Sequence, residues 1–156
     1  MAGILSKDIC VYLGEASYNT STDVWTFSNY NEIFNIQAIP SLGGTEEQVD
    51  VTCLKDANRK YIKGIKDFGD SVEFTCLFDN SDSGSNFRRV RTLEEAGEPV
   101  AVKVEMPDKP ASGTHGTTFE FAAQVSASLN EAEVNQALTF ALRCAIQSDM
   151  VVTNPA

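Results

Sequence analysis

Apolar and polar residues alternate along several stretches of the chain. The longest of these stretches are Ser71–Phe78, Val100–Met106, Thr118–Ser126 and Asn135–Gln147. In the first, Val72, Phe74 and Cys76 share one side, and Glu73 and Thr75 share the other. Because successive side chains point to opposite faces of a strand, this period predicts antiparallel strands that are buried on one face. The alternation therefore indicates a mainly β protein.

A shorter alternation, Gln48–Cys53, is separated from Ser71–Phe78 by a segment without any period, from about Leu54 to Asp70. We expect the Gln48–Cys53 strand to be half-buried like the others. The segment after it is long for a connection inside one domain, and such loops are usually functional or disordered. It carries five of the 12 Lys and Arg residues of the chain: Lys55, Arg59, Lys60, Lys63 and Lys66.

The remaining sequence is acidic. The formal net charge is -10, and residues 1–54 contain one basic residue against seven acids. This balance argues against general affinity for nucleic acid or for an anionic membrane, both of which need basic patches. An acidic domain with one basic loop instead favours self-assembly, in which the loop of one copy docks on the acidic surface of the next.

One helix is predicted, over Ser85–Ala96, with Asp82, Ser83 or Ser85 as its N-cap and Gly97 at its C-terminal end. A second helix over Glu131–Leu142 is an alternative, but the alternation continues through Ile146 and favours a strand there. Six or seven strands with one helix predict an antiparallel β-sandwich or small barrel, with the helix covering an open edge or face.

A chain of 156 residues is long enough to form one domain with its own core. We expect an N-terminal arm over residues 1–30, the β domain over residues 31–149 and a C-terminal tail over residues 150–156. Trp25 packs on the core or meets a neighbouring subunit; the sequence leaves both open. The start of the chain has no signal-peptide pattern, and no stretch reaches the length of a membrane helix.

No motif for catalysis, for a cofactor or for a metal is present. His115 lies in a Gly/Thr loop without a nucleophile or an orienting acid near it in sequence. The four cysteines lie far apart, and we expect buried, reduced thiols; they are Cys10, Cys53, Cys76 and Cys144. An enzyme is therefore the weakest hypothesis, and we expect no cofactor.

The region from Glu32 to Ser148 resembles the major tail tube proteins of long-tailed, siphovirus-type bacteriophages. The resemblance rests on four consecutive pieces: an I-P-x-L-G-G start at Ile39–Gly44, a V-D-V-T-x-L strand at Val49–Leu54, a basic aromatic loop at Lys55–Tyr61 and G-x-x-D-x-G at Gly64–Gly69. Each piece is short, but their order and spacing together make a strong signal.

The resemblance implies a β-sandwich that forms hexameric rings, which stack into a hollow tube in the virion after assembly in the host cytoplasm. The tube would carry double-stranded DNA without binding it specifically, and would meet tail terminator, tape-measure and distal tail proteins. It also implies that the loop makes contacts between subunits and rings, through Lys55, Arg59, Lys60, Tyr61, Lys63 and Lys66. A tube protein of a contractile injection or secretion machine, or a β-sandwich surface or adhesion module, are the alternatives.

A tube needs one sheet face toward the core and the other toward the channel. Three acids on polar strand faces are candidates for the channel: Asp50, Glu73 and Glu120. The alternative is that they lie on the outer surface or rim.

Overall fold

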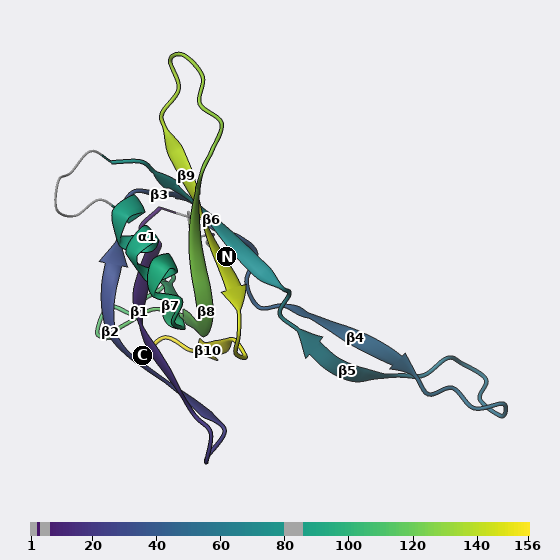
Figure 1. Cartoon of the computed structure of the whole chain (residues 1–156). Coiled ribbons are helices and arrows are strands. Elements are labelled where there is room, and N and C mark those ends of the chain that lie inside the picture. Colours follow the sequence, from purple (N-terminus) through teal and green to yellow (C-terminus); the bar gives the residue numbers. More distant parts are fainter. Residues whose placement is uncertain (1–2, 4–6, 80–85) are drawn as a thin grey trace.

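The computed structural model describes residue 3, residues 7–79 and residues 86–156. Within this part the chain forms ten strands and one helix (Figure 1). The elements are β1 (Cys10–Asn19), β2 (Val24–Ile33), β3 (Ile36–Ala38), β4 (Thr45–Asp50), β5 (Tyr61–Asp67), β6 (Ser71–Leu77), α1 (Asn86–Ala96), β7 (Val100–Glu105), β8 (Thr118–Leu129), β9 (Thr139–Ile146) and β10 (Val151–Thr153). The predicted mainly β fold with one helix is confirmed.

Eight strands form one antiparallel sheet in the order β2-β1-β7-β8-β9-β6-β3, with β10 paired to β8. Strand β8 connects its two halves. Residues 118–123 of β8 pair with β7, whereas residues 123–129 pair with β9. We call this sheet, together with α1, the body. The remaining two strands, β4 and β5, form a separate sheet that projects from it (Figure 1).

The core lies on one face of the large sheet. Its largest fully buried side chains include Phe74, Phe121, Phe140 and Leu142, which come from β6, β8 and β9. Helix α1 adds Val90 to this core, and the Phe87 ring lies edge-on to Phe140 at 5.3 Å between centroids. Burial alternates along β6 as the sequence predicts, because its apolar residues face this core.

Helix α1 covers the edge of β8 that β7 leaves unpaired. The Ala127 amide donates to Oε2 of Glu94 at 3.4 Å, and the Gln124 side-chain amide donates to the Gly97 carbonyl at 3.2 Å. Gly97 has a positive φ of 68°, as expected for a glycine that ends a helix. The predicted N-caps Asp82, Ser83 and Ser85 lie outside the described residues. No helix in the described part is long and apolar enough to span a bilayer.

Two expectations about the terminal segments differ from the structure. The expected N-terminal arm contributes β1, which pairs with β7 and buries Val11 and Leu13 in the core. The expected C-terminal tail contributes β10, which pairs with β8 after the buried Met150. Both segments supply apolar residues to the sheet, so described residues 10–33 and 150–153 belong to the body.

The segment between Gln48 and Asp70 also differs from its prediction. Every residue of β4 is exposed, so the alternation of Val49, Val51 and Cys53 does not face the core. The segment expected to be a structureless loop contains β5, which pairs with β4. The register of this pairing shifts between Glu46 and Gln48 of β4, where β5 contains one extra residue. This bulge obscures the period of β5 in the sequence.

We expect Phe140→Ala to lower the free energy of unfolding by about 3–5 kcal/mol, because it leaves a cavity in the core. Leu129→Ala is the matched control: Leu129 lies directly opposite Phe140 in the β8–β9 register but is 57% exposed. Its effect should stay within about 0.5 kcal/mol, as for most surface sites. Urea denaturation measures both, and equal losses would contradict this view of the core.

Candidate assembly surface

The β4–β5 hairpin and its tip, residues 45–67, form an arm that projects from the body (Figure 1). Its strands are held in register by cross-strand pairs such as Val49 with Ile62 and Asp50 with Tyr61. A two-stranded hairpin on its own is marginally stable in water. The arm has no core of its own, so its stability must come from its tip and from whatever packs against it.

One face of the arm is apolar toward the tip, and Glu47 lies on the same face nearer the body. Val49 and Ile62 lie directly opposite each other there, and Val51 follows on the same face by the period of the strand. Leu54 at the tip is fully exposed, and Ile65 is 87% exposed. Soluble monomers rarely expose contiguous apolar patches, and a patch of this kind usually marks an interaction site.

The opposite face of the arm is charged, and its charges pair with each other. Nζ of Lys63 lies 3.3 Å from Oε2 of Glu46, and Nη1 of Arg59 lies 3.3 Å from Oδ2 of Asp50. All of these side chains are substantially exposed, so each pair stabilises the arm by only about 0–1 kcal/mol. The basic residues found in the sequence are thus partly neutralised within the arm itself.

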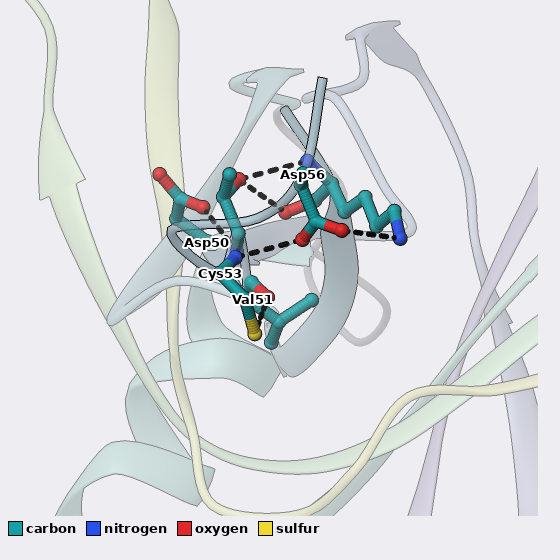
Figure 2. A network of polar contacts seen from close by, with 6 residues as sticks. Asp50, Val51, Cys53 and Asp56 are labelled. Atoms are coloured by element: carbon teal, nitrogen blue, oxygen red, sulfur yellow. Dashed lines mark hydrogen bonds and ion pairs between the residues drawn. The ribbon is translucent and has the colours of Figure 1, made fainter. Parts of the chain in front are cut away.

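The tip of the arm is organised by a network of polar contacts (Figure 2). Asp56 accepts from the Cys53 amide at 2.7 Å and pairs with Nζ of Lys60 at 2.9 Å. Thr52 Oγ1 accepts from the Lys60 amide at 2.9 Å. The amide of Cys53, with the Lys60 ammonium next, lowers the pKa of the Asp56 carboxyl below its usual value. The tip therefore has a defined shape, which the absence of a sequence period in this segment did not reveal.

The cysteines divide between core and surface. Cys76 and Cys144 are buried, and burial raises the pKa of each thiol to about 12, so both are unreactive. Cys53 was expected in a buried strand but lies exposed at the arm tip. Cys10 is only partly buried, so the expectation of buried thiols holds for Cys76 and Cys144 alone.

The three channel candidates do not lie together. Glu73 and Glu120 lie on the non-core face of the large sheet, on β6 and β8, whereas Asp50 lies on the arm and pairs with Arg59. Oε2 of Glu73 is 3.3 Å from Nη2 of Arg143, its cross-strand neighbour on β9. Glu120 lies directly opposite Lys103 on β7. Glu73 and Glu120 therefore each lie close to a cation.

The non-core face around Glu73 is made of small and polar side chains. Ser71 and Thr75 flank Glu73 on β6, and Ala141 and Ala145 flank Arg143 on β9. On β8 the same face continues with Gln124, Ser126 and Ser128, each opposite one of these β9 residues. The alternation predicted this polar face correctly, but the small size of its side chains becomes meaningful only once the strands are placed side by side.

Lys103 on the other half of the sheet lies between two aromatic rings. Its Nζ is 4.7 Å from the centroid of Tyr12 and 4.7 Å from that of Tyr30. Such cation–π contacts stabilise an ammonium by about 0.5–1 kcal/mol or more. The sequence held no signal for this cluster, because Lys103 on β7 is far along the chain from Tyr12 on β1 and Tyr30 on β2.

The family model described as "Phage tail tube protein, TTP" matches residues 2–148 of the chain. No curated protein sequence matches this chain closely enough to count as a relative.

Solved structures share the fold at low sequence identity. A chain of the anti-feeding prophage baseplate is 16% identical with a TM-score of 0.66, over 99% of this chain and 97% of that one. A chain of the gene transfer agent tail is 18% identical with a TM-score of 0.63, over 97% and 99%. A chain from the sheath/tube terminator of the extracellular contractile injection system PVC is 9% identical with a TM-score of 0.64, over 98% of both.

The pKa of Asp56 gives a test of the arm tip. Because the folded pKa is lowered, the contact between Asp56 and the Cys53 amide should persist at pH 3.8, the ordinary aspartate pKa, and break only as the pH falls further. In an NMR titration, the Cys53 amide signal should shift with a midpoint below pH 3.8. Asp56→Asn should abolish that shift, and a midpoint above 3.8 would contradict the network.

Proposed function

The chain belongs to the phage tail tube protein family, and we propose that it polymerises as stacked hexameric rings into the tail tube that conducts DNA into the host. The observation that carries this proposal is the arm, whose apolar face is exposed to solvent in the single chain. The six-fold symmetry of the gene transfer agent tail and of the prophage baseplate supports a ring of six.

The apolar face contributes more to assembly than the basic residues do. Burying one Val, Leu or Ile side chain stabilises a contact by about 1.5–3 kcal/mol, whereas an exposed ion pair adds about 0–1 kcal/mol. We propose that the apolar face supplies affinity between subunits or rings. Charged residues of the arm, Lys55, Arg59, Lys60, Lys63 and Lys66 with Tyr61 beside them, then select the position and orientation of the contact.

The arm also accounts for how the rings could stack into a filament. An arm that docks on a different surface of the next copy makes a heterologous contact, which repeats without closing. Rings joined in this way stack head to tail. The ends of the stack would be completed by other tail proteins, namely a terminator, a tape-measure protein and distal tail proteins, in a tube assembled in the host cytoplasm.

We further propose that the small, polar face around Glu73 lines the channel, and that Glu120 lies on the continuation of this face. Duplex DNA carries about one negative charge per 1.7 Å, so a lumen rich in unpaired Lys would hold it tightly. A face in which Glu73 balances Arg143 offers DNA no net positive charge. A channel role for Asp50 stays a prediction that would require the arm to reach the lumen.

A tube of a contractile injection machine is the second candidate, since a chain from the sheath/tube terminator of an extracellular contractile injection system shares the fold. Electron microscopy of the purified protein separates the possibilities. Long tubes, formed equally with and without a chelator, support the tail tube. Isolated stable rings favour the injection machine, and persistent monomers contradict both.

Ile62→Ser should raise the protein concentration needed for tube formation by about 10- to 100-fold, because the apolar face loses about 1.5–3 kcal/mol per contact. The melting temperature of the monomer should hardly change, since Ile62 is 55% exposed. Val152→Ser on β10 is the matched control, with a valine of similar exposure. Sedimentation measures polymer, and normal assembly of the Ile62 variant would refute the role of this face.

Glu73→Lys should leave tubes intact but slow DNA ejection, most strongly at low salt, because every ring would then present extra positive charge beside Arg143. Glu95→Lys on α1 makes the same charge change away from this face. Ejection from particles carrying each variant is followed across salt concentrations. If the Glu73 variant ejects DNA at the normal rate and salt dependence, this face does not line the channel.

A further inference from the structure

We propose that the arm of one copy docks on one end of the sheet of another copy, at an apolar patch bordered by acids. We call this the end patch; it consists of Phe34, Phe78, Leu129, Val134 and Leu138, with Glu131 and Glu133 beside it. This inference rests on the proposed function and adds to it the surface that receives the arm.

The strand register places these residues at the same end of the body. Leu129 is the last residue of β8, and Leu138 directly precedes β9. The Phe78 amide, just beyond β6, donates to the Leu138 carbonyl at 2.9 Å. Phe34 directly precedes Asn35, whose carbonyl accepts from the Leu77 amide at 2.9 Å. Residues far apart in sequence thus meet where four strands begin or end.

All five apolar side chains of the end patch are exposed in the single chain, and Val134 is 89% exposed. The arm of the same copy does not cover them, since it leaves the body in a different direction from the β8–β9 loop (Figure 1). A patch of this kind marks an interaction site. Its apolar side chains match those of the arm, Val49, Val51, Leu54 and Ile62, in chemistry.

The charges identify the occupant as a second copy of this chain. Glu131 and Glu133 are exposed beside Val134, and no basic residue occurs between Leu129 and Leu138. The arm tip offers the opposite charge through Lys55, which is exposed directly after the fully exposed Leu54, whereas Arg59 and Lys60 pair with acids of the arm. An apolar centre with an acidic border therefore fits an apolar arm with a basic border.

The contact also has the right symmetry for a tube. Arm and end patch are different surfaces of one chain, so their contact is heterologous and leaves a free patch and a free arm at opposite ends of every assembly. Opposite charges at the border disfavour the reversed arrangements, in which two arms or two end patches would meet with like charges.

A cross-linking experiment tests this contact with a native residue. Cys53 is exposed at the arm tip, and Val134→Cys would place a second exposed thiol at the end patch. Tubes of the Val134→Cys protein, treated with a short bifunctional maleimide, should yield a ladder of covalent oligomers. The matched control, Val134→Cys with Cys53→Ser, should yield monomers. Tubes that form but give no ladder above the control would overturn the proposal.

Charge reversal gives an independent readout. Glu131→Lys with Glu133→Lys should reduce the sedimenting polymer at least tenfold, and adding Lys55→Glu should restore part of it. The control pair, Glu95→Lys with Glu98→Lys, carries the same charge change at and just after the end of α1 and should assemble normally.

The outcomes distinguish a failure of the proposed function from a failure of the proposed contact between arm and end patch. If the unmodified chain forms no tubes, the proposed function fails. If it forms tubes, but the Glu131 and Glu133 double variant assembles as well as the control pair, the end patch does not receive the arm while the proposed function stands.

Discussion

Strand β8 hydrogen-bonds to different neighbours along its length, and the rest of the body depends on this division. Its first half pairs with β7 and its second half with β9, so one strand joins the two halves of the sheet around a shared core. The edge that β7 leaves open needs a cover, and α1 provides it through contacts of Glu94 and Gly97 with β8. The N-terminal hairpin and the C-terminal strand complete the same sheet. A buried backbone edge without partners would cost free energy, which explains why α1 lies where it does.

The body buries its own apolar residues, whereas the arm leaves its apolar residues exposed. Phe74, Phe121 and Phe140 are fully buried by the chain that carries them. Val49, Ile62 and Leu54 remain in contact with water. The hydrophobic effect acts equally on both sets, so the arm still has apolar surface to bury, and the proposed function assigns that burial to another subunit. The chain belongs to the phage tail tube protein family, and an arm with exposed apolar side chains is what the proposed assembly into a tube requires.

Electrostatics has a secondary role in this arrangement. The arm carries many cations, but Arg59, Lys60 and Lys63 each pair with an acid of the arm at 3.3 Å or less. Such exposed pairs stabilise little, and they orient side chains more than they hold surfaces together. The same holds on the sheet, where Glu73 and Arg143 neutralise each other on a face of small polar residues. In the proposed assembly, charge would select which surfaces meet and which face lies near DNA, while apolar burial would supply the affinity.

Much of the body follows from local sequence alone. Period-2 alternation located β6, β7, β8 and β9, and the glycine at position 97 marked the end of α1, because side-chain direction and backbone freedom are local properties. Local properties do not say what covers a strand. Gln48–Cys53 alternates as regularly as Ser71–Phe78, yet the first is exposed on the arm and the second is buried on one face. Only the tertiary structure determines whether the apolar side of a strand packs against the core. For the same reason Asp50 and Glu73 looked equivalent in sequence and lie on different sheets. The family resemblance was also present in the sequence. The shape of the arm, the pairing of its charges and the patch at the end of the sheet came only from the folded chain, because each depends on how the backbone places side chains in space.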